Sequence, residues 1–136
     1  MENRILPNEV LLEEVGALLA EGREVTFTPK GNSMLPFIRG GRDSVTLKKL
    51  DTVEVGDIVL VRLPDSRYVL HRAFRLSGEK LEVMGDGNLS GTESCTLADV
   101  MGTAVKVNGR KPSRGRLWRW LKPVRRYLLG IYRRLI

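Results

Sequence analysis

The sequence contains few side chains that could form crosslinks or bind metal ions. Its 136 residues include one cysteine, Cys95, and one histidine, His71. A single thiol excludes a disulfide within the chain, and it also excludes a zinc site built on paired thiolates. We therefore expect no metal and no other cofactor. This cysteine usage is typical of a reduced, cytoplasmic protein.

Long hydrophobic runs are also missing. The longest apolar stretches, residues 15–20 and 127–132, reach six residues only if a glycine is counted in each. A membrane-spanning helix needs about 20 apolar residues, so we expect no span. Four glutamates among the first 14 residues interrupt the place where a secretory signal would have its apolar core.

The composition is that of a globular protein with an uneven charge. Hydrophobic residues make up 42% and charged residues 29%, and the length fits one domain. The net charge is +7, but residues 110–136 hold ten Lys or Arg and no acid. We therefore divide the chain into a mildly acidic body, residues 1–109, and a basic tail, residues 110–136.

The spacing of apolar residues predicts one helix followed by strands. Leucine and valine repeat at helical spacing from Leu11 to Leu19, which favours a helix at residues 9–21 between an Asn8 cap and a Gly22 stop. From Val25 onward the period changes to two. Strands are expected at residues 25–28, 44–47, 57–63, 67–76, 80–84 and 100–107. The body is thus predicted to be mostly β with a short N-terminal amphipathic helix.

A candidate nucleophile follows the first predicted strand, in the segment Gly31-Asn32-Ser33-Met34-Leu35-Pro36. A serine between glycine and proline can be presented by a sharply turning backbone, and nearby N–H groups are then free to form an oxyanion hole. We interpret Ser33 as the nucleophile, with Gly31 and Met34 supporting the turn and the oxyanion hole. An ordinary surface serine is the alternative.

Two further residues could complete a catalytic set. His71 lies in the predicted strand 67–76, and Asp86 lies in the turn Gly85-Asp86-Gly87-Asn88. Imidazole is suited to act as a general base near neutral pH, so a Ser–His pair in this chain must use His71. A carboxylate can orient the ring and stabilise its protonated form. The alternatives are a packed strand histidine and a plain Asp-Gly turn.

Four segments in this order resemble the signal peptidase I and LexA-like serine peptidases. They are Ser33-Met34-x-Pro36, Gly56-Asp57-Ile58-Val59, Val69-Leu70-His71-Arg72 and Gly85-Asp86-Gly87-Asn88, and the likeness covers about residues 24–107. Bacterial leader peptidases and LexA-type proteins have a lysine base in the third segment. Its replacement by histidine resembles the archaeal and endoplasmic-reticulum branch of signal peptidases. The resemblance implies a LexA-like β fold, with Ser33 as nucleophile, His71 as general base and Asp86 as orienting acid.

The sequence departs from this family in several places. The histidine branch often has a further aspartate a few residues after the turn, where this chain has Glu93. Signal peptidases have an N-terminal membrane span, and this chain has a charged amphipathic helix instead. LexA-type repressors have a DNA-binding domain for which the stretch before Val25 is too short. A truncated relative in this group cleaves itself at a Cys-Gly or Ala-Gly bond. Neither dipeptide occurs in this sequence, so we expect no self-cleavage at the usual bond.

We therefore expect a serine endopeptidase that cleaves an extended leader or precursor peptide by a Ser–His–Asp mechanism. By resemblance, the substrate would have small residues before the scissile bond and would pair with an exposed strand edge. Two alternatives belong to other classes: a non-catalytic interaction module on the same fold, and a nucleic-acid-binding protein that uses the basic tail.

The basic tail predicts an amphipathic helix at a surface. Apolar residues recur at spacings of three and four from Leu117 to Leu135, and Pro123 kinks or restarts this helix. Arginines, lysines and four aromatic rings accompany the stripe, so we expect residues 115–136 to bind an anionic membrane surface. The protein would then be cytoplasmic and peripheral at the inner face of the membrane. Packing on the body, a homo-oligomer or an acidic partner are alternatives, whereas nucleic acid would leave the apolar half of the surface unused.

Overall fold

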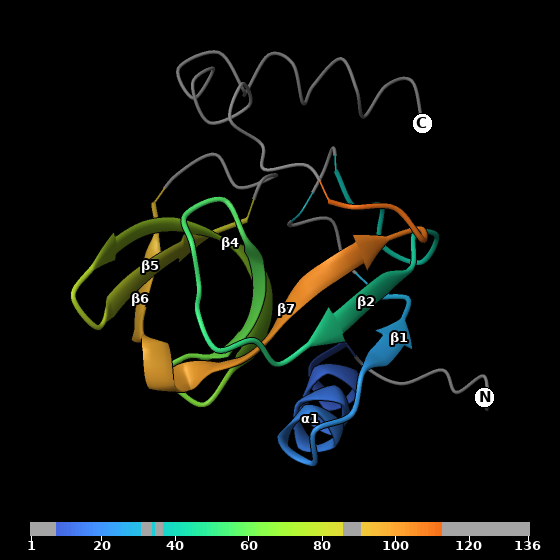
Figure 1. The fold of residues 1–136 in the computed structure, drawn as a ribbon, viewed down its shortest axis with the longest axis horizontal. Helices are drawn as coiled ribbons and strands as arrows, with labels where there is room; N and C mark the ends of the chain where they lie inside the picture. The colour runs from blue at the N-terminus through green and yellow to red at the C-terminus, as the bar shows by residue number, and fades with distance from the viewer. Residues whose placement is uncertain (1–7, 31–33, 35–36, 86–90, 113–136) are drawn as a thin grey trace.

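A computed structural model describes residues 8–30, 34, 37–85 and 91–112. Within these ranges one helix precedes an antiparallel sheet, as Figure 1 shows. The helix is α1 (Asn8–Ala20), and a 3-10 helix, η1 (Leu97–Asp99), follows later. The strands are β1 (Val25–Phe27), β2 (Val45–Lys48), β3 (Ile58–Arg62), β4 (Tyr68–Ser77), β5 (Lys80–Met84), β6 (Glu93–Thr96) and β7 (Val100–Val107). The prediction of a mostly-β body is confirmed.

The strand order explains the shape of the sheet. The seven strands run β1-β2-β7-β3-β4-β5-β6, so that β7 lies between β2 and β3. On one side of β7 lie β1, β2 and α1, and on the other side β3 to β6 curl round on themselves (Figure 1). The register shifts within the β2–β7, β3–β7 and β4–β5 pairs. Such bulges bend and twist a strand, which is consistent with the curl.

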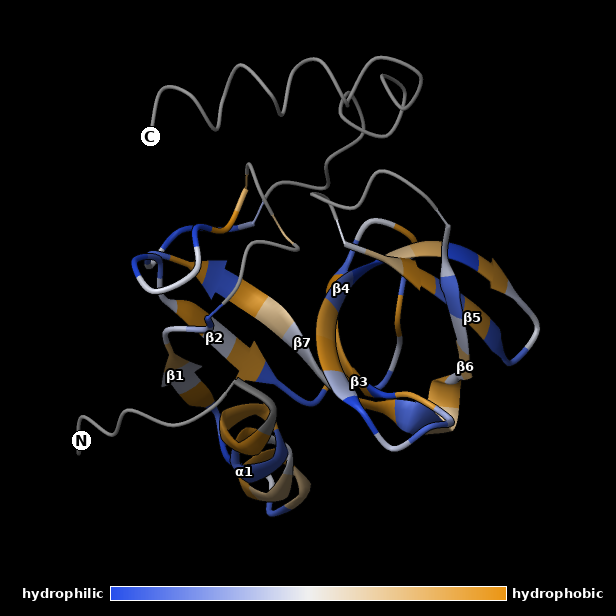
Figure 2. Cartoon of the chain, turned by 180° about the vertical axis from the view of Figure 1, so that it is seen from behind, coloured by the Kyte–Doolittle hydropathy of each residue, from blue (hydrophilic) through white to orange (hydrophobic). Residues whose placement is uncertain are grey.

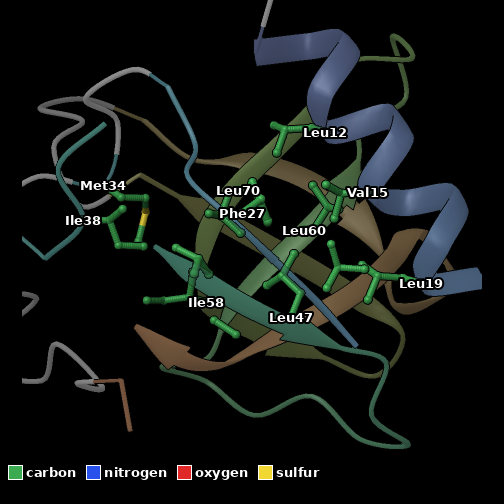
Figure 3. Close-up of a cluster of buried hydrophobic side chains, with 13 residues drawn as sticks. Leu12, Val15, Leu19, Phe27, Met34, Ile38, Leu47, Ile58, Leu60 and Leu70 are labelled. Atoms are coloured by element: carbon green, nitrogen blue, oxygen red, sulfur yellow. The ribbon is translucent and has the colours of Figure 1, made fainter. Parts of the chain in front are cut away.

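Two hydrophobic clusters form the core, one on each face of the sheet. The first core cluster is packed between α1 and the sheet, and Figure 3 shows Leu12, Val15 and Leu19 of α1 directed at it. The second core cluster comprises Val59, Val61, Leu63, Ala73, Leu81, Val83 and Cys95. Successive side chains of a strand point to opposite faces, so β3 contributes alternate residues to the two clusters. This explains why the first four residues of β3 are all apolar, whereas Figure 2 shows hydrophobic and hydrophilic residues alternating along other strands.

The helix α1 ends at Ala20, one residue earlier than predicted, and Gly22 forms the predicted stop. This residue has φ +84°, a conformation that glycine adopts without strain. The Gly22 N–H donates to the Leu19 carbonyl at 3.0 Å, and the Arg23 N–H donates to the Leu18 carbonyl at 3.3 Å. These two bonds form a Schellman motif, which satisfies carbonyls that the helix end would leave free.

The predicted strands agree with the structure to within one or two residues, but two elements were missed. The prediction omitted β6 and η1, which directly precede β7. β6 is a four-residue edge strand in which only Cys95 is buried, so it has almost no apolar pattern. The Asn108-Gly109 turn is confirmed, with φ values of 51° and 77°.

No helix in the described ranges is long and apolar enough to cross a membrane. The predicted helix of the basic tail, residues 115–136, lies outside the described residues and stays a prediction.

Candidate functional site

The predicted catalytic set falls partly within the described structure. His71 and Met34 are described, whereas Ser33, Asp86 and Gly31 lie outside the described residues. The roles of Ser33, Asp86 and Gly31 therefore stay predictions. The described part of the candidate site consists of His71 and of the residues that follow Ser33.

His71 lies near the middle of β4, in the curled half of the sheet. It pairs with Val59 of β3, and only 7% of its surface is exposed. Paired residues project to the same face, so the imidazole shares a face with Val59 and, by alternation, with Val69 and Ala73. The ring therefore lies on the face of the second core cluster, opposite α1.

One imidazole nitrogen is unsatisfied. Nδ1 of His71 is buried and has no hydrogen-bond partner in the part of the chain that the structure describes. The Thr103 hydroxyl is in the same situation, and Val59 pairs with both residues, so the two unsatisfied groups lie in one row across β4, β3 and β7. Buried polar atoms in folded proteins are nearly always bonded, and an unpaired one calls for a functional or structural reason.

The surroundings of His71 favour its neutral form. Burial lowers the pKa of His71 below its ordinary value, because a charged ring would lose its hydration. The Glu93 carboxylate acts in the opposite direction and raises this pKa, whereas the Arg67 guanidinium lowers it. Burial is the largest of the three effects. A neutral imidazole at neutral pH has a free lone pair and can accept a proton, as a general base must.

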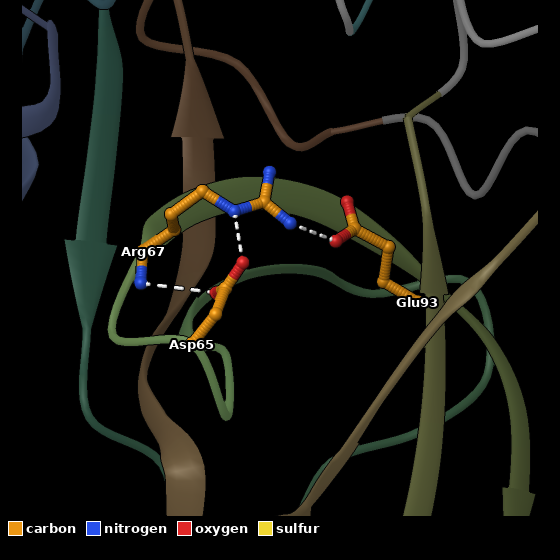
Figure 4. A network of polar contacts seen from close by, with 3 residues as sticks. All are labelled: Asp65, Arg67 and Glu93. Carbon is orange, nitrogen blue, oxygen red and sulfur yellow. Dashed lines mark hydrogen bonds and ion pairs between the residues drawn. The ribbon is translucent and has the colours of Figure 1, made fainter.

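Glu93, which stands where the histidine branch often has an aspartate, takes part in an ion-pair network (Figure 4). Its carboxylate accepts a hydrogen bond from Arg67 Nη2, and Arg67 Nε donates to Asp65 Oδ2 at 2.6 Å. This Arg67 contact lowers the pKa of Asp65. The Arg67 and Asp65 side chains are about half exposed, so the network adds little stability. Its relevance to the site is electrostatic, since it places one cation and one anion near the imidazole.

Met34 begins a turn directly after Ser33 in the sequence. Its carbonyl accepts hydrogen bonds from the N–H groups of Phe37 and Ile38, both at 3.0 Å. The Met34 side chain is only 3% exposed and belongs to the first core cluster beside Ile38 (Figure 3). The residue that follows the predicted nucleophile is thus fixed by both its backbone and its side chain. The predicted oxyanion role of Met34 stays a prediction.

The sequence analysis gave no role to Arg72, which is the most deeply buried charged residue described. It is 1% exposed, its Nη1 donates to the Gly56 carbonyl at 2.8 Å, and its guanidinium lies 5.0 Å from the centre of the Phe37 ring. Arginine is almost never fully buried unless it has specific partners. The signal available in the sequence was its position inside an apolar strand segment, next to His71.

Among the described residues, neither a reactive thiol nor a cluster of metal ligands is found. Burial raises the pKa of the Cys95 thiol to about 11, with a smaller contribution from Asp99, so the thiol is protonated and unreactive at neutral pH. No group of three or more His, Cys, Asp or Glu residues within the described ranges could hold a metal ion.

Comparison with models of known protein families finds no match to this chain, and a search of curated protein sequences finds no significant relative.

Proposed function

We propose that this protein is a serine endopeptidase with a LexA-like or signal peptidase-like fold. The observation that carries the proposal is His71: the single histidine of the chain is buried in the sheet, its burial favours the neutral form, and its Nδ1 has no partner among the described residues. A histidine with a purely structural role would normally have both ring nitrogens bonded or exposed. A neutral imidazole can accept a proton, and its Nδ1–H can donate to an orienting carboxylate. These two properties fit a general base better.

In the proposed mechanism, His71 removes the proton from the Ser33 hydroxyl as its oxygen attacks the carbonyl carbon of a peptide bond. The tetrahedral intermediate collapses when the C–N bond breaks, and His71 returns the proton to the departing amine. Water then attacks the resulting ester, again with His71 as base, and releases Ser33 and a carboxylic acid. Asp86 would accept the hydrogen bond of the Nδ1–H group, which is otherwise unpaired.

The proposed substrate is an extended leader or precursor peptide. A peptide in this conformation can hydrogen-bond to the edge of a sheet, and the edges of this sheet are β1 and β6. The preference for small residues before the cleaved bond rests on the family resemblance.

A fluorophosphonate probe tests the proposal without knowledge of the substrate. We expect one probe adduct on the full-length protein, located at Ser33 by peptide mass mapping. The adduct should be lost in Ser33→Ala and form far more slowly in His71→Gln. Ser94→Ala removes an exposed serine of β6 and serves as the matched control. If the wild-type protein does not react, or if labelling survives Ser33→Ala, the peptidase proposal is wrong and the interaction-module alternative is favoured.

A further inference from the structure

Adjacent residues of β4 face opposite sides of the sheet, and here they are His71 and Arg72. Arg72 pairs with Ile58, whose side chain belongs to the first core cluster. The guanidinium therefore lies on the α1 side of the sheet, and the imidazole lies on the other side. Because the two residues are joined by one peptide unit, the contacts that fix the Arg72 side chain also constrain the backbone of His71.

The first contact of Arg72 is with the chain just before β3. Arg72 Nη1 donates to the Gly56 carbonyl, while the Gly56 N–H donates to the Ala73 carbonyl at 2.9 Å. The Ala73 N–H in turn donates to the Asp57 carbonyl at 2.7 Å. Backbone bonds on one side and a side-chain bond on the other thus fix Arg72 relative to β3.

The second contact of Arg72 is with the segment that follows Ser33. The guanidinium lies over the ring of Phe37 at 5.0 Å, within the range of a cation–π interaction. Phe37 belongs to the turn whose first carbonyl is that of Met34, the residue next to Ser33. None of the described residues between β1 and β2 belongs to a strand, and the ring–guanidinium contact joins Phe37 of this segment to β4.

From these contacts we propose that Arg72 is a positioning residue, which sets the distance between Ser33 and His71 through the Phe37 ring. The inference rests on the proposed peptidase function and goes beyond it, because it gives a role to a residue outside the proposed set of Ser33, His71 and Asp86. Arginine suits this role because its planar guanidinium can donate to a carbonyl in its plane and stack on a ring with its face. The compact ammonium group of lysine cannot do both in the same geometry.

Substitutions at Phe37 test the proposal with little risk to folding. Phe37→Leu keeps an apolar side chain but removes the ring face, and Phe37→Tyr keeps the ring. We expect the rate of Ser33 phosphonylation to fall roughly 10- to 100-fold in Phe37→Leu, as it does for small misplacements of reacting groups, and to be retained in Phe37→Tyr. Arg72→Lys should resemble Phe37→Leu, and the double variant should be no slower than either single variant.

Phe74→Leu is the matched control. Phe74 carries the guanidinium of Arg75 at 5.9 Å on the same strand, so Phe74→Leu removes a ring–guanidinium pair other than that of Phe37 and Arg72. Its rate of phosphonylation should equal that of the wild type. The pH at which the rate is half-maximal should stay constant in all these variants, because the imidazole lies on the opposite face of the sheet.

An NMR measurement separates positioning from a general loss of stability. The chain has one histidine, so its imidazole ¹H–¹³C signal needs no assignment. Ser33→Ala should shift this signal in the wild-type background but not in the Phe37→Leu background. Equal shifts in both backgrounds, or unchanged phosphonylation in both Phe37→Leu and Arg72→Lys, would overturn the role of Arg72 and leave the peptidase proposal standing. A wild-type protein that does not react overturns the peptidase proposal itself, and the inference with it.

Discussion

Two neighbouring residues of β4, His71 and Arg72, are both polar and both buried. Arg72 is bound by a carbonyl and a ring, whereas Nδ1 of His71 has no partner among the described residues. The cost of burying a polar atom depends on whether it is bonded, so the two residues should respond very differently to substitution and to pH.

The first prediction concerns the pH dependence of stability. Burial lowers the pKa of His71 in the folded protein, below the value of about 6.5 that the unfolded chain has. Between these two pKa values the unfolded state binds more protons than the folded state. The contribution of His71 to stability is therefore complete above about pH 6.5 and is lost as the pH falls through this window.

Chemical denaturation across this pH range, with NMR titration of the imidazole signal, measures the effect. His71→Gln should remove this part of the pH dependence and leave the carboxylate-driven part at lower pH. The half-maximal pH of Ser33 phosphonylation should also lie below 6.5, since the same group titrates. An imidazole pKa above 6.5 would contradict both expectations.

The second prediction concerns the unsatisfied Thr103 hydroxyl. Valine has the same shape without the hydroxyl, so Thr103→Val should raise the free energy of unfolding by about 1 kcal/mol. Thr46→Val is the matched control on the neighbouring strand β2. It removes a 2.8 Å hydrogen bond to the Thr26 hydroxyl and should lower the free energy of unfolding by up to about 1 kcal/mol.

Urea denaturation of the two threonine variants decides between these outcomes. If both variants lose stability equally, the Thr103 hydroxyl has a partner after all, and its pairing in one row with His71 has no significance for the site.

At the scale of elements, the packing of α1 on β7 depends on one glycine. A Cβ atom at Gly102 would lie 2.7 Å from Cδ1 of Leu19, a residue with no exposed surface. Gly102→Ala should therefore lower the free energy of unfolding by about 1–3 kcal/mol through overpacking. Gly16 lies at the same interface, but the nearest atom to a Cβ there would be the flexible end of Met101 at 3.3 Å, and Cε1 of Tyr68 would lie at an ordinary contact distance of 3.6 Å. Gly16→Ala should be neutral or stabilising by up to about 1 kcal/mol, because alanine favours a helix.

Thermal and urea denaturation of the two glycine variants test this difference. Equal effects of Gly16→Ala and Gly102→Ala would show that α1 can shift over the sheet. Because a Cβ at Gly102 would clash with Leu19, we expect Leu19→Val to lower the free energy of unfolding less in the Gly102→Ala background than in the wild type.

The sequence predicted elements well where the apolar pattern decides the structure. β3, β4, β5 and β7 alternate or are continuously apolar, and α1 has both a helical repeat and a glycine stop. β6 was missed because an edge strand with one buried residue leaves no periodic signal. Its position depends on pairing with β5, a contact between residues 10 to 16 apart in the sequence that local propensity does not encode.

The site shows the same division. His71 could be chosen as a candidate because the chain has no other histidine and because the four segments occur in a recognisable order. Arg72 was not identifiable, since an arginine in a strand is normally exposed and its burial results from packing against Gly56 and Phe37.

At the scale of the whole molecule, the basic tail would attach the body to a membrane. We propose that residues 115–136 bind anionic headgroups, since each basic residue near such a surface contributes about 1 kcal/mol. The tail can be removed cleanly after Pro112, because the strand pairing of the body extends to Arg110, which bridges back to Val107. A shorter version that ends at Asn108 would lose this bridge.

Vesicle flotation compares the full-length protein with the version that ends at Pro112. We expect the full-length protein to float with vesicles that contain anionic lipid and the truncated version to stay at the bottom. Salt should weaken the binding, and neutral vesicles should recover neither protein. Equal recovery of the two proteins, or binding that ignores lipid charge, would contradict the membrane proposal and favour packing of the tail on the body or on a second copy.

The central position of β7 also has a consequence for how the protein is made. β2 and β3 are consecutive strands, yet they meet only through β7, which comes last in the sequence among the described strands. Until residues 100–107 emerge, β2 and β3 each present an open edge, and the first core cluster lacks Ala104. A nascent chain in this state resembles an aggregation-prone intermediate. Translational pauses before β7 should therefore increase dependence on chaperones, whereas pauses after it should not.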